Sequence, residues 1–158
     1  MKNFFTKYSL LFFTVMISIP VLGQSSKDQK KNSSYYDFET ECLQDKLDGS
    51  YIFYAWGKGS NKADAINQAK RNAINDLLFK GINKGCQLTP LIVEVNGESK
   101  YKSYVYSFFQ KDYIDYITIE KSPKKLFKSQ QQTTYGVKIC INTQALKQKL
   151  IKDNIISK

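Results

Sequence analysis

The chain has 158 residues, with 24 basic and 14 acidic residues for a net charge of +10, and it contains no histidine. The lack of histidine removes the commonest general base, the Ser–His and Cys–His nucleophile pairs and the histidine metal ligands. The carboxylates form no conspicuous catalytic motif. We therefore expect a protein that is not an enzyme, with no catalytic residue, no cofactor and no metal site.

The first 23 residues have the pattern of a secretory signal peptide. Lys2 and Lys7 form a positive start, residues 8–19 are apolar, and Pro20 precedes the compact residues around Gly23. The alternative is a membrane anchor, but this apolar stretch is shorter than the roughly 20 residues that a spanning helix needs. We expect cleavage after Gly23, no transmembrane segment in the mature chain, and a periplasmic or secreted location.

Composition also suggests where the folded part begins. Residues 24–37 are polar, rich in lysine and without periodicity, which is typical of a disordered lead-in. Residues 38–158 are of the usual size for one domain. We expect them to form a single α+β domain.

The positive charge is unevenly distributed. Residues 24–99 contain ten basic and ten acidic residues, whereas residues 100–158 contain twelve basic and four acidic residues. Such asymmetry occurs on surfaces that bind nucleic acid, acidic glycans or anionic lipid. However, Arg71 is the single arginine of the chain, and specific phosphate and base recognition favours arginine. Solubilising charge is the simpler interpretation, and an anion-binding face is the alternative.

Residues 49–57 are apolar on both alternating faces, which predicts a central strand covered on both sides. A helix capped by Ser60 or Asn61 follows, and Gly81 or Gly85 ends it. Its apolar residues fall on one arc at the helical period. They are Ile66, Ala69, Ala73, Ile74 and Leu77.

Gly57 and Gly59 lie between this strand and this helix. A dinucleotide-binding loop requires a third glycine where Lys62 stands, and the phosphate-binding Walker pattern does not fit either. Backbone amides at the helix start, beside Lys58 and Lys62, are one alternative site for an anion. We predict instead that the glycines permit a tight reversal from strand to helix.

The second half alternates between helix and strand patterns. Residues 88–95 predict a strand, and residues 99–112 fit both a helical stripe and strand alternation, with Ser99 as a cap that favours a helix. The rings of this segment are core filling, with a base-stacking platform as the alternative. Residues 115–120 and 135–142 predict a hairpin.

A final helix is predicted over residues 143–155, capped by Asn142 or Thr143. The element order is then β-α-β-α-β-β-α. This order indicates the α+β class, with a mainly antiparallel sheet and helices packed against it.

The connection between the two hairpin strands, residues 121–134, is rich in lysine and contains no acidic residue. It is long for a hairpin loop, so either the strands continue into a projecting ribbon or the loop is mobile. In both cases it forms a cationic finger. The candidate anion-binding or partner-binding residues are Lys121, Lys124, Lys125 and Lys128.

The chain contains three cysteines, which tend to pair in an oxidising compartment. Cys42 precedes the first strand and Cys86 follows the first helix, so both can lie at one end of a βα unit. Cys140 falls inside an alternating strand, where a free thiol acts as a small apolar side chain. We predict a disulfide between Cys42 and Cys86, although the sequence alone leaves the other pairings open.

Four features of the sequence resemble a family of exported bacterial domains. They are the strand of residues 51–59, the repeated alanines of residues 63–78, the glycine after that helix, and the last strand with its helix. The family includes the N-terminal domain of the flagellar ring assembly protein, related small outer-membrane lipoproteins and uncharacterised secreted proteins of Gram-negative bacteria. The resemblance covers roughly residues 50–150. The lipoproteins carry a lipidated cysteine at the cleavage point, and this chain has Gly23 and Gln24 there, so membrane anchoring does not transfer.

The resemblance implies a sheet with helices against it, a role in envelope assembly or scaffolding with envelope proteins as partners, and no catalytic residues. The leading hypothesis from the sequence is therefore a structural or interaction module of the cell envelope. The alternative is a polyanion-binding protein that uses its basic second half.

Overall fold

The structure is a computed structural model, and it describes residues 38–128 and 132–157. The predicted signal peptide and lead-in lie outside the described residues, so their boundaries stay predictions. No helix in the described ranges is long and apolar enough to cross a membrane. The elements are β1 (Glu41–Asp45), β2 (Ser50–Gly59), α2 (Lys62–Asn75), the π-helical turn η2 (Asp76–Lys80), α3 (Gly97–Lys100), α4 (Lys102–Gln110), the 3₁₀ turn η3 (Asp112–Tyr116), β3 (Ile117–Lys128), β4 (Thr133–Asn142) and α5 (Thr143–Lys152).

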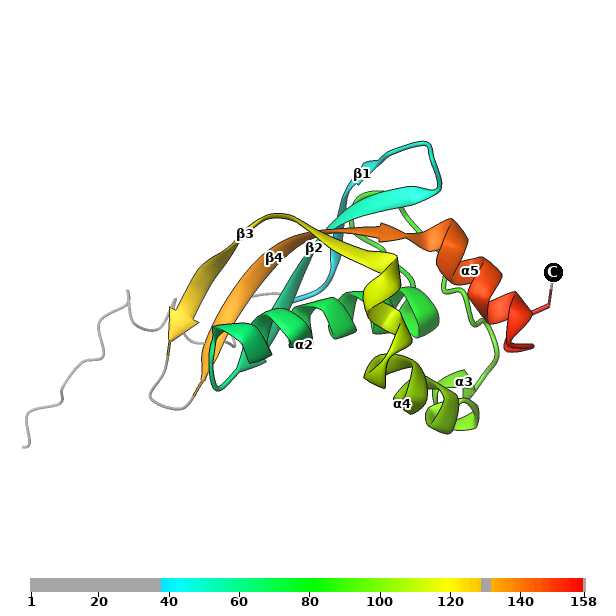
Figure 1. The fold of residues 1–158 in the computed structure, drawn as a ribbon. Coiled ribbons are helices and arrows are strands. Elements are labelled where there is room, and N and C mark those ends of the chain that lie inside the picture. Colours follow the sequence, from blue (N-terminus) through cyan, green and yellow to red (C-terminus); the bar gives the residue numbers. More distant parts are fainter. Residues whose placement is uncertain (1–37, 129–131, 158) are drawn as a thin grey trace, which may run out of the picture. The chain divides into compact units, whose positions relative to one another are not determined.

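The strands form one sheet in the order β1-β2-β4-β3, and all three pairs are antiparallel. Helix α2 lies along one face of this sheet, and α5 follows β4 at one end of it (Figure 1). The predicted α+β class with an antiparallel sheet is confirmed. β2 is central, as expected. The prediction that it is covered on both sides is wrong, because α2 covers one face and the side chains of the opposite face are half-buried or exposed beyond Ile52.

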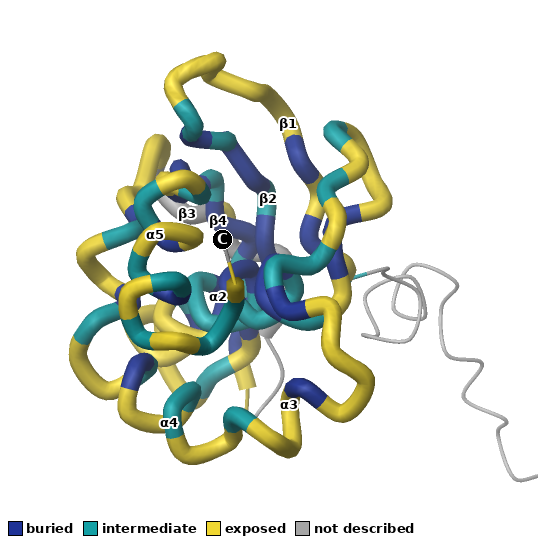
Figure 2. The backbone as a smooth tube through the Cα atoms, turned by 90° about the vertical axis from the view of Figure 1, so that its right-hand side faces the viewer, coloured by how far each residue is buried: buried dark blue, intermediate teal, exposed yellow. Residues whose placement is uncertain are grey.

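The core lies between the sheet and the helices. Its strand residues include Phe53, Ala55, Val137 and Ile139, all fully buried. In Figure 2 the buried stretches lie toward the middle of the domain, and the turn between β1 and β2 is exposed. The helices supply Ala65, Ala69, Ala73, Ile74, Leu146 and Leu150 to the same core.

Side chains cap the two main helices where the sequence predicts it. The Asn61 side chain accepts a hydrogen bond from the Asp64 amide at 3.0 Å, and Asn142 accepts one from the Ala145 amide at 2.9 Å. These bonds satisfy amides that have no partner inside the helix. The helical segment that starts with α2 continues through η2 and ends at Gly81, whose φ of +75° favours glycine.

The prediction of a strand over residues 88–95 is wrong. Leu88 makes only an isolated bridge with Ile82. The amides of Leu91 and Ile92 donate at 2.9 and 2.8 Å to the carbonyls of the last helical turns, which would otherwise lack partners. Pro90 has no amide to give to a sheet ladder. The strand that completes the sheet is instead β1, which is short and mostly polar and therefore gives no alternation signal.

The helix and the hairpin predicted for the second half agree with the structure, but the predicted Ser99 cap does not. Residues 99–112 are largely helical, although Ser99 lies inside α3 and does not cap a helix. β3 and β4 form the predicted hairpin, and their pairing extends to Lys128 and Thr133, which is the ribbon alternative. Residues 129–131 lie outside the described part. The register of β3 on β4 shifts at three places, between Ile119 and Lys128.

The predicted disulfide between Cys42 and Cys86 is confirmed, with 5.5 Å between the two Cα atoms. It joins β1 to the segment after η2, where the Cys42 amide also donates to the Lys84 carbonyl at 2.9 Å. Gly85 permits this approach, because its φ is +89° and a Cβ there would lie 1.9 Å from the Cys42 carbonyl oxygen. Cys140 is free and buried, as predicted.

Candidate functional site

The two faces of β2 have different roles. Phe53, Ala55 and Gly57 point toward α2, and the intervening residues Tyr54 and Trp56 therefore point to the opposite face. In the described part of the chain, no helix lies over this second face along the β3–β4 ribbon (Figure 1). A face left open by the helices is the part of the fold that is available to a partner.

Two aromatic rings lie side by side on this face above Gly136 of β4. The Tyr54 and Trp56 rings are 4.9 Å apart, at an angle of 82°. A Cβ at Gly136 would lie 2.2 Å from the Tyr54 hydroxyl oxygen and 2.6 Å from Cζ3 of Trp56. Glycine at this position therefore allows both side chains to pack closely against β4. Burial raises the pKa of the Tyr54 hydroxyl, so this ring stays uncharged over a wider pH range.

Phe38 completes the aromatic cluster at its edge. Its ring meets Trp56 edge to face at 5.8 Å, and the Lys58 Nζ lies 4.9 Å from the Phe38 ring centroid. The quadrupole of an aromatic ring attracts such a cation. Lys58 is thereby associated with the rings although it is exposed to solvent.

Lysines extend from these rings across β4 and β3. Lys138 stands opposite Tyr54 in the sheet and also opposite Lys121, while Lys124 stands opposite Gly136. Residues that are directly opposite in an antiparallel pair share a face. We define the open sheet face by these rings and cations. It consists of Tyr54, Trp56, Lys58, Lys121, Lys124 and Lys138.

The structure thus brings together two of the four predicted finger lysines, Lys121 and Lys124, which are exposed. For Lys125 and Lys128 it describes only the backbone, which stands opposite Tyr135 and Thr133. Sequence reasoning missed Lys138, although this is the one charged residue within the alternating last strand and its position signals the outward face.

Acidic groups on this face are few in the described region. Glu41 stands opposite Tyr54 at the β1 edge. Glu120 is paired with Lys46 at 3.0 Å, beside the buried Cys140, and this hydrogen bond lowers the pKa of the Glu120 carboxyl and raises the pKa of the Lys46 amine. This ion pair lies at the end of the open sheet face that is nearest Ser50. Positive charge therefore dominates the part around the rings.

The two glycines of the strand-to-helix turn serve packing. A Cβ at Gly57 would lie 2.0 Å from the Ala65 carbonyl oxygen, and one at Gly59 would lie 2.4 Å from the Ala65 amide nitrogen. The helix start is occupied by the Asp64 carboxylate, which accepts a hydrogen bond from the Asn61 side chain at 2.7 Å. A second anion would meet this negative charge, so the geometry supports the predicted reversal.

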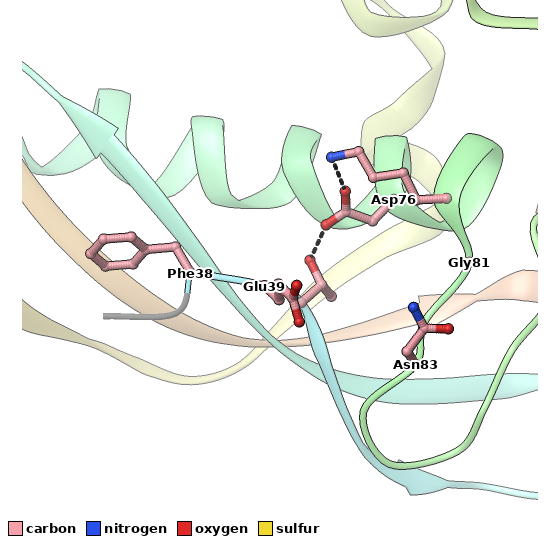
Figure 3. Close-up of a pocket in the computed structure, with 7 residues that line it drawn as sticks. Phe38, Glu39, Asp76, Gly81 and Asn83 are labelled. Carbon is pink, nitrogen blue, oxygen red and sulfur yellow. Dashed lines mark hydrogen bonds and ion pairs between the residues drawn. The ribbon is translucent and has the colours of Figure 1, made fainter. Parts of the chain in front are cut away.

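A small pocket of about 260 Å³ lies where the described chain begins, near the end of η2 (Figure 3). The Asp76 carboxylate points into it but accepts a hydrogen bond from the Thr40 hydroxyl at 2.5 Å and pairs with Lys80 at 3.0 Å. One carboxylate oxygen thus joins the residue before β1 to the helical segment, and the other is paired within η2. Among the described residues, no group of three or more carboxylate or cysteine side chains is placed to hold a metal ion.

Comparisons of the chain with protein-family models, with curated proteins and with solved structures found no match. Function has to be argued from the open sheet face itself.

Proposed function

We propose that the protein is a non-catalytic binding module whose open sheet face binds an acidic polymer. The observation that supports this most strongly is the juxtaposition of Tyr54 and Trp56 with four lysines on a face that the described helices leave open. The lysines alone have a simpler explanation, because lysines also protect the edge strands of a sheet from pairing with other chains. Half-buried rings beside several cations give both a contact area and a charge for an anionic chain.

An envelope location belongs to the same proposal. The disulfide between Cys42 and Cys86 fits an oxidising compartment, in agreement with the predicted signal peptide. The proposed function does not include catalysis, because the chain has no histidine and the Asp76 carboxylate in the pocket is bound by Thr40 and Lys80.

The test is polyanion binding as a function of salt, measured with immobilised heparin and duplex DNA. Four cations that each contact one phosphate of duplex DNA give a slope of about −3.6 in log–log units, so affinity should fall by roughly 100-fold between 50 and 200 mM salt. Replacing the four lysines of the open sheet face with glutamine should remove most of this slope. The residues are Lys58, Lys121, Lys124 and Lys138.

A matched variant controls for net charge. It replaces four exposed lysines on or beside α4 and α5, at the far side of the helices, with glutamine. They are Lys102, Lys111, Lys147 and Lys152. This control has the same net charge as the first variant and should keep most of the affinity. Equal loss in both variants would show that binding depends on overall charge, which contradicts a specific face.

A second candidate is an assembly module with a protein partner, which the resemblance to envelope domains favours. The supporting observation is an open groove of about 820 Å³ between residues 89–94 and the segment after α5. Val93 and Val95 beside it are 79% and 90% exposed. Replacing both valines with serine should abolish co-purification of a specific envelope protein, identified by mass spectrometry. Retention of that protein by the serine variant would argue against this candidate.

A further inference from the structure

Two lysines of the open sheet face are crowded together. Lys121 and Lys138 stand directly opposite each other on β3 and β4, where the Cβ atoms of opposite residues are about 5 Å apart. Like charges in such a pair repel each other. In the described part of the chain neither lysine forms an ion pair. The free protein therefore holds two cations side by side without an anion between them.

An irregularity in β3 adds a third cation to this pair. Lys124 is three residues beyond Lys121, so regular alternation would place its side chain on the opposite face of the sheet. The matching stretch of β4, from Lys138 to Gly136, is two residues long, and the register shifts there. An extra residue of this kind re-aims the side chains beside it. Lys124 consequently stands opposite Gly136, on the same face as Lys121 and Lys138.

A hydrogen-bond donor lies among these three lysines. The Tyr54 ring extends from its position opposite Lys138 toward Gly136, where its hydroxyl oxygen would lie 2.2 Å from a Cβ. The hydroxyl has no hydrogen-bond partner in the described ranges, and no buried polar side-chain atom of those ranges lacks one. It is therefore open to solvent. Burial of the ring raises its pKa, which keeps the proton available for donation.

The nearest acidic side chain, Glu120, does not neutralise this cluster. The pKa of its carboxyl is lowered first by the hydrogen bond from Lys46 at 3.0 Å and by the charge of Lys46, and less by the charge of Lys138. Glu120 is thus engaged mainly by Lys46. Three cations and one hydroxyl donor remain around Gly136, with a single carboxylate at their border.

Building on the function proposed above, we propose that this cluster binds a phosphomonoester in its dianionic form, so that the acidic polymer carries terminal phosphate groups. We call Lys121, Lys124, Lys138 and the Tyr54 hydroxyl the phosphate cluster. A phosphomonoester has a charge of about −1.5 to −2 at neutral pH and three strong acceptor oxygens. It therefore offsets the repulsion between crowded lysines better than a phosphodiester, a sulfate ester or a carboxylate, each of which brings one charge. Lysine binds phosphate as a point charge.

Phenyl phosphate and phenyl sulfate are matched probes for this cluster. Both present three terminal oxygens, and they differ by one charge once the phosphate has lost its second proton. Binding is followed by the shift of the Gly136 amide signal in NMR spectra. At pH 7.5 we expect phenyl phosphate to bind at least about fivefold more tightly than phenyl sulfate, because its extra charge meets cations at contact distance. At pH 5 the two should bind about equally, since the second pKa of a phosphomonoester is about 6.

This change with pH reports on the probe, because the chain contains no histidine. Carboxyls normally titrate below this pH range, and amines and phenols normally titrate above it. Cys140→Ala removes the one thiol beside the face and should show the same pH dependence. The charged and titratable groups that face the cluster are Glu41 from β1, Lys46 from the following turn, Tyr54 and Lys58 from β2, Glu120, Lys121 and Lys124 from β3, and Lys138 and Cys140 from β4.

Two variants locate the contact. Tyr54→Phe keeps the ring and removes the hydroxyl, and it should weaken phenyl phosphate binding by about tenfold or more, as expected for a hydrogen bond to a charged group. Lys121→Gln combined with Lys138→Gln should remove the preference for phosphate over sulfate. The matched control, Lys102→Gln combined with Lys111→Gln, replaces two exposed lysines outside the sheet and should keep this preference. Amide spectra of the free variants show whether each one is folded.

Vesicles distinguish the two carriers of such a group. Phosphatidic acid presents a phosphomonoester, and phosphatidylglycerol presents a phosphodiester. Equal flotation with both kinds of vesicle, together with binding of phenyl phosphate, would agree with a soluble polymer. Selective flotation with phosphatidic acid would assign the phosphate to a lipid headgroup and overturn the polymer as its carrier.

The remaining outcomes separate the phosphate cluster from the proposed function. Equal binding of phenyl phosphate and phenyl sulfate at pH 7.5, or a ratio that does not change with pH, would overturn the phosphate cluster. Heparin binding that still depends on the four lysines would then leave the proposed function in place. Binding of phenyl phosphate without binding of heparin or duplex DNA would overturn the proposed function and leave the cluster.

Discussion

Reduction of the disulfide between Cys42 and Cys86 should destabilise the protein by a calculable amount. The two cysteines are 44 residues apart in sequence. In the chain-entropy model a cross-link of this span removes about 13 cal/mol/K of entropy from the unfolded chain, which is about 4 kcal/mol at 25 °C. Typical domains have a free energy of unfolding of about 5–15 kcal/mol. Reduction should therefore remove a large share of the stability.

The loss should be concentrated at one edge of the sheet. β1 has five residues and is held on one side by β2 and on the other by the disulfide and the Cys42–Lys84 backbone hydrogen bond. Freed of the cross-link, this edge should open first. Hydrogen exchange should show faster exchange of the Cys42 amide after reduction, with little change at Ile139 in the middle of the sheet.

Urea unfolding of oxidised and reduced protein, followed by circular dichroism, measures the difference in free energy. The variant Cys140→Ala is the control, because Cys140 is free, and it should show the same difference between its two redox states. A difference below about 1 kcal/mol would refute the entropic argument. Peptide mapping that joins Cys140 to another cysteine would refute the pairing.

Three further changes test the fold. Gly57→Ala should lower the free energy of unfolding by at least about 1–3 kcal/mol, because a Cβ would approach the α2 backbone to 2.0 Å; chemical denaturation measures this against Asn67→Ala, an exposed site on the same helix. Asn142→Ala removes the α5 cap and should cost about 1 kcal/mol in the same assay. Burial raises the pKa of Asp153, but hydrogen bonds, one of them from Lys149 at 2.8 Å, outweigh it and leave the pKa lowered. A carboxyl whose folded pKa is lowered stabilises the protein above its unfolded pKa, near 3.9, and loses that contribution as pH falls through the folded pKa. Unfolding curves of Asp153→Asn should therefore vary less with acid pH than those of wild type, and parallel curves would contradict this.

Much of the fold follows from periodicity and caps. The stripe of Ala69 and Ala73, the cap at Asn61 and the alternation around Ile139 each depend on neighbours in sequence, and each prediction agrees with the structure. The sequence does not predict β1, because the pairing of β1 with β2 and its disulfide are long-range contacts that leave no local pattern. The strand prediction for residues 88–95 is wrong because apolar composition does not show whether backbone amides pair with a sheet or with a helix end.

The candidate site was harder to predict for a related reason. Alternation shows that Tyr54 and Trp56 share a face, but it does not show which face the helices leave open. The register that places Lys138 beside Lys121 and Gly136 beneath the rings exists only once β4 lies between β2 and β3. The lysine-rich segment of the sequence therefore identifies two of the four lysines on the open sheet face, Lys121 and Lys124. The sheet order adds Lys58 and Lys138.

The uneven register of β3 has a consequence for self-association. β3 forms one border of the sheet, and a straight, regular border strand is a template on which another chain can add. Three register shifts and an internal Pro123 interrupt the spacing of its backbone groups, and the exposed Lys121 and Lys124 would repel the same strand of a second copy. The irregularity therefore discourages fibre-like growth at this border even when the protein is concentrated.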